Sequence, residues 1–471
     1  MVAVAYGTLA GLVLPSGVSG GATDRIALND ALSAGLAVEL APGTYYIDEP
    51  LLLGADGNSI TGTPASVITL VSAFSGSAAI QVTADDCGLS WFQMAAQGNA
   101  ALNGPAQIDA IDQTGCQRLK VDHIYAAGIN GWVINTAATT ATFNADSMYT
   151  NIAARGCAGG FFAQSNPTLN YRGELFASNL QFQEMGAASG AATGLDIILL
   201  EDIDDIEMGH VNTGFAMSAA SGGYSLHLKD CGSSWLTDLD TEGALVEDSG
   251  TRNCDQVRIT RMDGPVTHTS DGYRVWYDTC LFGGPGSGFT YSGTGLITLM
   301  DCTFNGSNSS AGTNYDLDIT GSGTIRVLDC MFETGIGTST TNEVPASVYL
   351  ATSNNAYFDG CQFLGSGAGP ANWFTNGRPQ YMRNPGQGPG PAIHQPSMPA
   401  SGTAVGNNTA FDCTVYLQAT SIDGLAINGT TVFTATGGSG TGPKTMQVSV
   451  GAGQTFTPTY TGTLNGTWSS P

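Results

Sequence analysis

A Cys-x-Phe tripeptide occurs four times in the second half of the chain. The copies are Cys280-Leu281-Phe282, Cys302-Thr303-Phe304, Cys330-Met331-Phe332 and Cys361-Gln362-Phe363. The cysteines follow one another at intervals of 22, 28 and 31 residues. A parallel β-helix returns to the same face after roughly 20–30 residues and, unlike a helical repeat of fixed period, tolerates coils of unequal length. Because residues two apart on a strand point to the same side, Cys and Phe are expected to form columns inside a stack of coils.

The composition agrees with an all-β chain. Among 471 residues there are 65 glycines, and only 11% of the residues are charged. Glycine is typical of turns and is poor in long helices, while the apolar fraction of 42% is enough to build a large core. Short apolar segments such as Leu195–Leu199 and Ile325–Leu328 alternate with Gly, Asn, Asp and Ser turns. We therefore predict a right-handed, single-stranded parallel β-helix.

The charge excludes several kinds of partner. The net charge is −25, with only 14 Lys and Arg residues, which argues against nucleic acid and against an anionic membrane surface. No apolar run reaches the roughly 18 residues that a membrane-spanning helix needs, so no membrane insertion is expected. No Lys or Arg precedes Arg25, so the sequence predicts no signal peptide and synthesis in a cytoplasm. The ten cysteines contain no C-x-x-C pair and are expected to be buried free thiols.

Four segments are predicted along the chain. Residues 1–48 hold an N-terminal segment and a capping helix, in which Thr23 and Asp24 form the N-cap and first turn. Leu28, Ala31, Leu32 and Gly35 are expected on one face of this helix. Residues 49–376 form the β-helix. Residues 377–402 contain six prolines and are predicted to be a linker. Residues 403–471 alternate in the manner of a β-sandwich, with a turn at Asn428-Gly429.

Two stretches resemble known protein families. The order of a helix, then Pro42-Gly43-Thr44-Tyr45-Tyr46-Ile47, then a Leu run and a Gly turn resembles the start of pectate-lyase-like right-handed β-helix proteins. The run Phe411–Tyr416, followed by Ile422–Thr430 and Val448–Tyr460, resembles the small C-terminal β-domain of tail proteins from phages of actinobacteria. Together these resemblances imply a tail fibre, tailspike or minor tail protein located in the virion, usually a homotrimer, which contacts other tail or baseplate proteins.

One strand carries the best candidate site. Trp235-Leu236-Thr237-Asp238-Leu239-Asp240-Thr241-Glu242 places three acids at alternate positions, so Asp238, Asp240 and Glu242 are expected on one face about 6–7 Å apart. Paired carboxylates at such separations hydrolyse glycosidic bonds, and a nearby Trp can stack on a sugar ring. The alternative is an ordinary solvated strand face. Trp132 is a second candidate for glycan binding, with core packing as its alternative.

The remaining motifs are weaker. The acidic segment Glu201–Glu207 leaves Ca²⁺ open as a ligand, although its spacing matches no known Ca²⁺ loop, and otherwise no cofactor or metal ligand is predicted. The ordered motifs of polygalacturonases are absent. The leading hypothesis is therefore a tail fibre or tailspike-type protein that attaches to a host cell-surface polysaccharide. The alternatives are a depolymerase, which would be a polysaccharide hydrolase or lyase, and a purely structural tail or baseplate component.

Overall fold

The computed structural model describes residues 11–97, 107–137, 146–165, 174–185, 195–213, 223–249, 252–283, 287–305, 315–333, 348–351, 356–364, 374–375, 381–383, 398–407, 413–437, 440–451 and 454–469. The predicted linker falls mostly outside these ranges, as do five of its six prolines; Pro399 is described. The chain divides into two compact units, Met1–Leu281 and Phe282–Pro471. None of the helices in the described ranges is long and apolar enough to cross a membrane.

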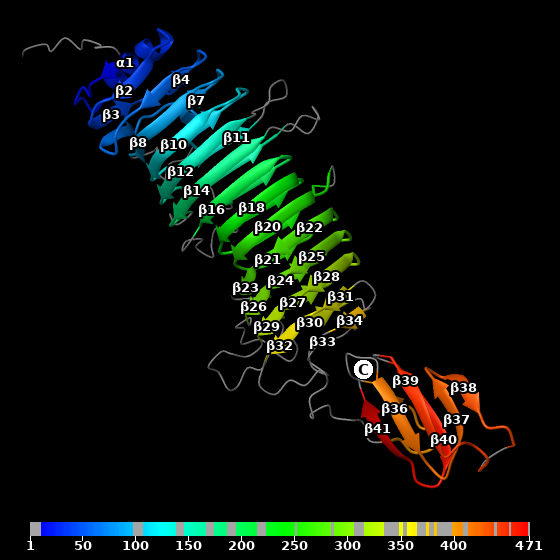
Figure 1. The fold of residues 1–471 in the computed structure, drawn as a ribbon. Helices are drawn as coiled ribbons and strands as arrows, with labels where there is room; N and C mark the ends of the chain where they lie inside the picture. The colour runs from blue at the N-terminus through cyan, green and yellow to red at the C-terminus, as the bar shows by residue number, and fades with distance from the viewer. Residues whose placement is uncertain are drawn as a thin grey trace, which may run out of the picture. The chain divides into compact units, whose positions relative to one another are not determined.

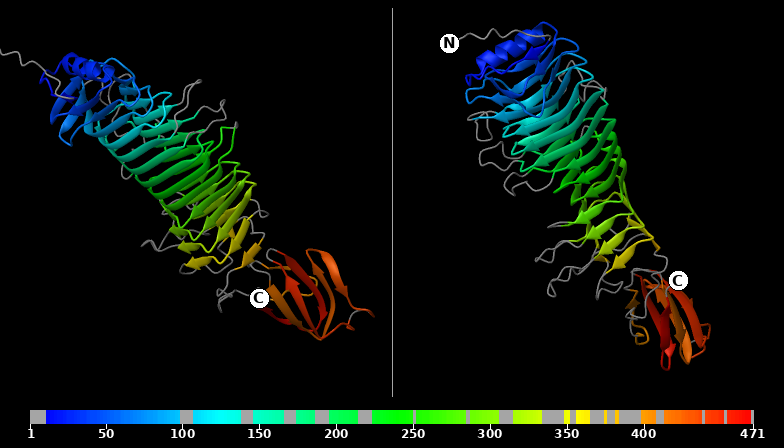
Figure 2. Two further views of the ribbon diagram at one scale, coloured as in Figure 1. Left: turned by 45° about the horizontal axis from the view of Figure 1, so that its top comes forward. Right: turned by 60° about the vertical axis from the view of Figure 1, so that its left-hand side comes forward.

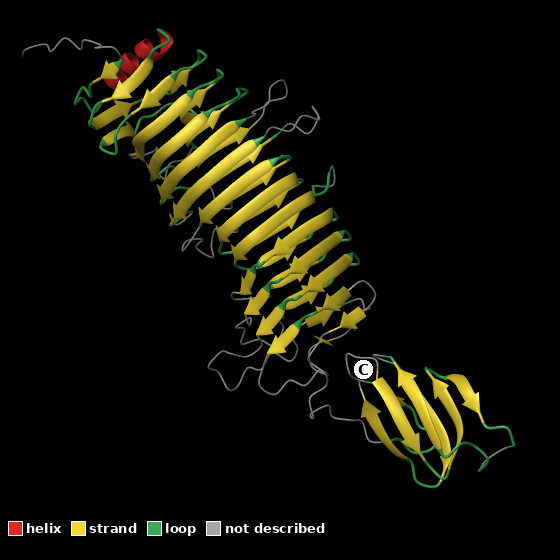
Figure 3. Cartoon of the chain, in the orientation of Figure 1, coloured by secondary structure: helices red, strands yellow, loops and turns green. Residues whose placement is uncertain are grey.

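Helix α1 (Ala22–Ser33) packs against the first strands of the N-terminal unit (Figure 3). Three members of the predicted face, Leu28, Ala31 and Leu32, are buried, whereas Gly35 lies beyond the end of the helix and is exposed. The predicted N-cap is wrong, because Gly21 takes that position, whereas Asp24 lies in the first turn as predicted. The Asp24 carboxylate instead accepts hydrogen bonds from the backbone N–H groups of Ser16 (2.8 Å) and Tyr46 (2.9 Å). It therefore ties the helix to the strands that the helix covers.

The N-terminal unit consists of two parallel sheets whose strands alternate along the chain (Figures 1 and 2). The first sheet contains β1 (Leu12–Val13), β2 (Ala37–Leu40), β3 (Gly43–Ile47), β5 (Ser59–Thr61), β6 (Ser66–Leu70), β8 (Gly88–Ala96), β10 (Lys120–Ala127), β12 (Ser147–Arg155), β14 (Leu175–Gln183), β16 (Ile206–Asn212), β18 (Gly232–Asp240), β20 (Asp255–Asp263) and β22 (Tyr273–Asp278). The second contains β4 (Leu51–Leu53), β7 (Ala78–Val82), β9 (Asp109–Gln113), β11 (Trp132–Ala137), β13 (Gly159–Gln164), β15 (Ile198–Glu201), β17 (Leu226–Lys229), β19 (Ala244–Glu247) and β21 (Val266–His268).

The long strands of the first sheet contain residues in the left-handed backbone conformation, and one of these positions recurs in register from coil to coil. In β18 this residue is Asp238 (φ 55°), and its counterparts are His210 in β16 and Arg261 in β20, with φ near 53° and 52°. The paired register skips these positions, because Gly209 pairs with Thr237 and Val211 pairs with Leu239. Such a residue bends the strand and shifts the alternation that follows it by one position.

The second unit also contains two sets of parallel strands. One set is β23 (Leu281–Gly283), β25 (Leu296–Met300), β26 (Thr303–Asn305), β28 (Thr324–Leu328), β29 (Met331–Glu333), β31 (Ala356–Asp359), β32 (Gln362–Leu364) and β34 (Tyr381–Arg383). The other is β24 (Phe289–Tyr291), β27 (Leu317–Ile319), β30 (Val348–Leu350) and β33 (Phe374–Thr375). From β24 to β33, two strands of the first set follow each strand of the other. The predicted fold class, a parallel β-helix with an N-terminal helical cap and a C-terminal β-sandwich, is confirmed.

The Cys-x-Phe motif marks a bend rather than the middle of a strand. Strand β26 begins after Cys302, so the expectation that Cys and Phe share one strand is wrong. The expectation of buried columns is right: the rings of Phe304 and Phe332 stack with centroids 4.4 Å apart. All ten cysteines are free and buried. Two copies of the motif are preceded by an Asp, and these residues, Asp301 and Asp329, have φ near 52° at the bend.

The C-terminal β-sandwich consists of two antiparallel sheets. One contains β35 (Val405–Gly406), β40 (Thr455–Thr461), β37 (Ser421–Ile427) and β38 (Thr430–Thr434); the other contains β39 (Thr445–Val450), β36 (Cys413–Gln418) and β41 (Asn465–Ser469). Val415, Ile422, Phe456 and Trp468 belong to the core between them. The predicted Asn428-Gly429 turn joins β37 to β38, and both residues have positive φ, as a two-residue hairpin requires.

Candidate functional site

The outer face of β16, β18, β20 and β22 gathers aromatic and charged side chains in register. Trp235 in β18 is 58% exposed, and it pairs with Glu207 on one side and Arg258 on the other. Arg258 in turn pairs with Trp276 in β22. The backbone of Arg258 therefore lies between those of two tryptophans, and its guanidinium pairs with the carboxylate of Asp278 at the end of β22.

Asp238 is held as a carboxylate by its neighbours. Arg261 in β20 binds both of its oxygens, with Nη2 2.9 Å from Oδ2, and His210 Nδ1 lies 3.3 Å from Oδ2. The hydrogen bond from Arg261 and the charges of Arg261 and His210 lower the pKa of Asp238, outweighing its slight burial. A carboxylate fixed in this way is a poor proton donor. The structure therefore makes Asp238 a positioning group for Arg261 rather than an acid.

The predicted alternation of Asp238, Asp240 and Glu242 on one strand is wrong. The left-handed conformation of Asp238 breaks the alternation, so Thr237 and Asp238 both face outward before Leu239 is buried. Glu242 lies beyond the end of β18. Asp240 does remain on the outer face, where it accepts a hydrogen bond from the side-chain amide of Asn212 (2.9 Å).

The structure pairs Asp240 with a carboxylate from the next coil. Asp240 is in register with Asp263 at the end of β20. Partial burial raises the pKa of Asp263, and the negative charges of Asp240 and Glu242 raise it further. Side chains in register on neighbouring parallel strands are about 4.8 Å apart, close to the roughly 5 Å between the two carboxyl groups of retaining glycosidases. Of this pair, Asp263 has a raised pKa beside a second carboxylate, a feature expected of a proton donor.

Sequence reasoning missed the partners that come from other coils. Asp263 lies in a different segment of the sequence from Asp240, and the register between coils cannot be read from one strand. Sequence reasoning did not consider Arg258, Arg261 or Trp276 as parts of the site. The only signal was the alternation of Val257-Arg258-Ile259, which places Arg258 on an outer face.

Trp132 has a structural role. It is only 5% exposed, and its indole stacks on Phe162 with centroids 5.3 Å apart. Gly159 of the next coil lies against this ring, and a Cβ there would approach the indole to 2.5 Å. An indole buried in this way presents no face to a sugar, which favours the core-packing interpretation.

The acidic segment Glu201–Glu207 is partly compensated by cations from later coils. Lys229 Nζ lies 2.7 Å from Glu201 Oε1, and Arg252 Nη2 lies 3.0 Å from Asp204 Oδ1. Within the described ranges, no group of three or more His, Cys, Asp and Glu side chains has the arrangement of a metal site. Ca²⁺ binding by this segment stays a prediction.

Comparisons with known proteins give the fold. No family model and no curated protein match the sequence. Among solved structures, the pre-mature gene product 12 of bacteriophage phi29 matches 77% of this chain and 56% of its own, with 11% identity and a TM-score of 0.50. The Dettilon tailspike protein matches 78% and 70%, with 10% identity and a TM-score of 0.45. The A-module of the Azotobacter vinelandii mannuronan C-5 epimerase AlgE4 matches 81% and 97%, with 12% identity and a TM-score of 0.42. The chain spans just over half the length of the phi29 protein. At such identities the likeness shows the fold alone.

Proposed function

We propose that the chain is a phage tail fibre or tailspike-type virion protein that attaches to a host cell-surface glycan. The observation that carries this proposal is the exposed Trp235, in register with Arg258 and on the same strand as Asp240. A flat aromatic face beside hydrogen-bonding groups suits the apolar face and the hydroxyl groups of a sugar ring. The resemblance to tail proteins of actinobacteriophages and the fold shared with a bacteriophage gene product support a place in the virion.

The proposal includes three copies of the chain in one spike. A homotrimer would present three equivalent outer faces, and three weak sites together give high avidity without new contacts. Light scattering on the purified protein is expected to give three times the chain mass of 48.3 kDa. A monomer at micromolar concentration would contradict this part of the proposal.

Binding to cell-wall polysaccharide from actinobacteria tests the attachment. Trp235→Ala is expected to weaken binding of the full-length protein to the immobilised polysaccharide about three- to tenfold, because an aromatic stacking contact contributes roughly 0.5–1.5 kcal/mol. Tyr273→Ala is the matched control, since Tyr273 is a 63% exposed aromatic residue of β22 outside the paired column. Equal binding by the wild type and Trp235→Ala would contradict attachment through this face. No binding by the wild type would favour a structural tail component.

The paired carboxylates favour a depolymerase as the second candidate. In this mechanism Asp263 protonates the glycosidic oxygen, and Asp240 attacks the anomeric carbon to give a glycosyl-enzyme intermediate, which water then releases. The test is the appearance of new reducing ends when the protein is incubated with the same polysaccharide. Asp263→Asn and Asp240→Asn are each expected to lower the rate by about 10²–10⁴-fold, the usual contribution of such groups.

The control variant Asp238→Asn distinguishes the pair of Asp240 and Asp263 from the site that the sequence predicted on one strand. Asp238→Asn should retain most of the activity, because Asp238 is paired with Arg261 and donates no proton. Loss of activity in Asp238→Asn with retention in Asp263→Asn would reject the pair across coils. Absence of products with retained binding would leave attachment alone.

A further inference from the structure

The outer face of one sheet of the C-terminal β-sandwich is polar and uncharged. It is formed by alternate residues of β36 and β39 and by the start of β41. Its members are Thr414, Tyr416 and Gln418 in β36, Thr445, Gln447 and Ser449 in β39, and Asn465 in β41. All seven of these outward side chains are uncharged, in a chain whose net charge is −25. Charged partners therefore find no complementary group on this face.

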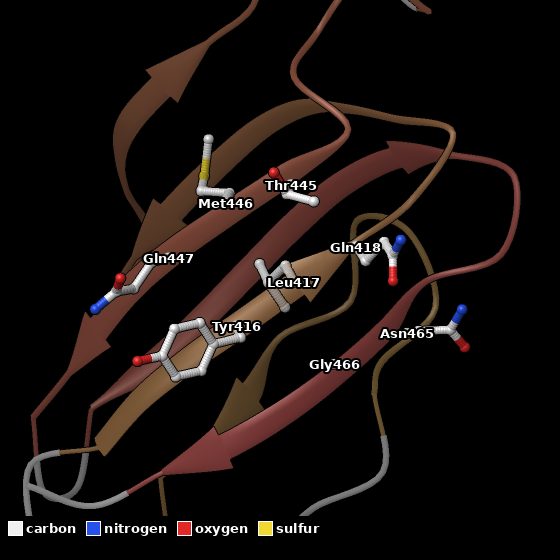
Figure 4. A pocket seen from close by; sticks show the side chains of 8 residues that line it. All are labelled: Tyr416, Leu417, Gln418, Thr445, Met446, Gln447, Asn465 and Gly466. Carbon is white, nitrogen blue, oxygen red and sulfur yellow. The ribbon is translucent and has the colours of Figure 1, made fainter.

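An open pocket of about 440 Å³ lies on this face (Figure 4). Tyr416 pairs with Gln447 at one end, and Gln418 pairs with Thr445 and Asn465 at the other. Figure 4 shows these two groups at opposite ends of the pocket. Positions two apart on a strand are separated by about 7 Å, so the pocket has the length of one to two sugar rings.

The side chains that line the pocket are available to a ligand. Tyr416 is 50% exposed, and Gln418, Gln447 and Asn465 are exposed as well. Within the part of the chain that the structure describes, these four side chains make no hydrogen bond to one another or to the backbone. Three amides supply both donors and acceptors, and the phenol supplies a flat ring with a polar tip.

We propose that this face binds an uncharged oligosaccharide. The ring of Tyr416 stacks on the apolar face of one sugar, and the amides of Gln418, Gln447 and Asn465 hydrogen-bond to its hydroxyl groups. A protein partner would require an apolar centre, whereas here the large apolar side chains of the sheet, Leu417 and Trp468, are turned into the core. This site lies in a different domain from Trp235, so it does not depend on glycan binding by the β-helix.

Affinity electrophoresis of the full-length protein tests the proposal. The gel contains dextran, mannan or arabinogalactan as a neutral polysaccharide, and alginate as an anionic comparison. At least one neutral polysaccharide is expected to retard the wild type. Tyr416→Ala should weaken that binding about tenfold, and Tyr416→Phe, which keeps the ring, should change it less than threefold. Val432→Ala is the matched control, since Val432 is a 57% exposed residue of the other sheet.

The following outcomes would contradict oligosaccharide binding by this face. Failure of every neutral polysaccharide to retard the wild type would overturn it, as would equal retardation of the wild type and Tyr416→Ala. Binding that falls steeply between about 0.05 and 0.5 M NaCl would show a charged ligand instead. The same gels run with Trp235→Ala separate the two proposals. If Trp235→Ala loses binding while Tyr416→Ala binds like the wild type, the β-helix face is supported and the site on the β-sandwich is rejected.

Discussion

A buried histidine in the N-terminal unit links stability to pH. His268, at the end of β21, is fully buried, and its Nδ1 lies 2.9 Å from the hydroxyl of Tyr277 in β22. Burial lowers the pKa of His268 to about 3, although the Ser270 backbone and Asp271 oppose that shift. In the unfolded chain the imidazole has a pKa near 6.5. The contribution of neutral His268 to the free energy of unfolding is therefore fully present above about pH 6.5, and it is lost as the pH falls toward 3.

Comparison of the wild type with His268→Gln isolates this effect. Urea unfolding of both proteins at pH 7.5, 6 and 5 gives the free energy of unfolding of each. Between pH 6 and 5 the wild type should lose about 1.2 kcal/mol more than the variant, because the unfolded imidazole binds on average about 0.9 proton in this range and the folded one binds almost none. All other titrating groups are common to both proteins. Parallel pH profiles would show that His268 does not remain neutral in the folded state.

At the scale of the strand, a left-handed residue that recurs in register from coil to coil sets the shape of the outer face. The positions include Asn151, Asn179, His210, Asp238 and Arg261, and the series in this unit ends at Thr279. Asn tolerates this conformation, whereas a β-branched residue such as Thr is strained in it. Thr279 has φ 56°, and its hydroxyl donates a 2.9 Å hydrogen bond to Asp278.

At such a position, replacing Thr by Asn should therefore raise the free energy of unfolding, and replacing Asn by Thr should lower it. Thr279→Asn is expected to raise the free energy of unfolding by about 1 kcal/mol through relief of backbone strain, despite losing the hydrogen bond to Asp278. Asn179→Thr, at φ 55°, should lower it by at least as much, because it also loses a 2.7 Å hydrogen bond to Asn151. Urea unfolding measures both. A destabilised Thr279→Asn would mean that the hydroxyl contact outweighs the strain.

The same positions explain what the sequence alone could predict. The Cys-x-Phe motif was sufficient for the architecture, because column-forming residues recur whenever a coil closes. It was insufficient for the site, since Asp238 and Asp240 look equivalent in a strict alternation. Only the backbone conformation of Asp238 separates them. The pairing of Asp240 with Asp263 depends on the length of the loop between two coils, and loop length carries no register signal in a single sequence.

At the scale of the whole molecule, the ten thiols are buried in every part of the fold. Burial raises the pKa of Cys87 to about 11 and that of Cys116, Cys157, Cys231 and Cys361 to about 12. The reactive species is the thiolate, so at pH 8 these groups are both inaccessible and protonated. The native protein is expected to react with less than one equivalent of a thiol reagent, and the urea-unfolded protein with ten.

The position of Cys413 makes this reaction a test of independent unfolding. Cys413 lies in the core of the β-sandwich, whereas the other nine cysteines lie among the β-helical coils. If the sandwich opens on its own, Cys413 will be alkylated at a urea concentration at which the other nine are still protected. Peptide mass spectrometry after pulse labelling identifies which thiol has reacted. Simultaneous labelling of all ten would show a single cooperative transition, and labelling of several thiols in the native protein would contradict the buried columns.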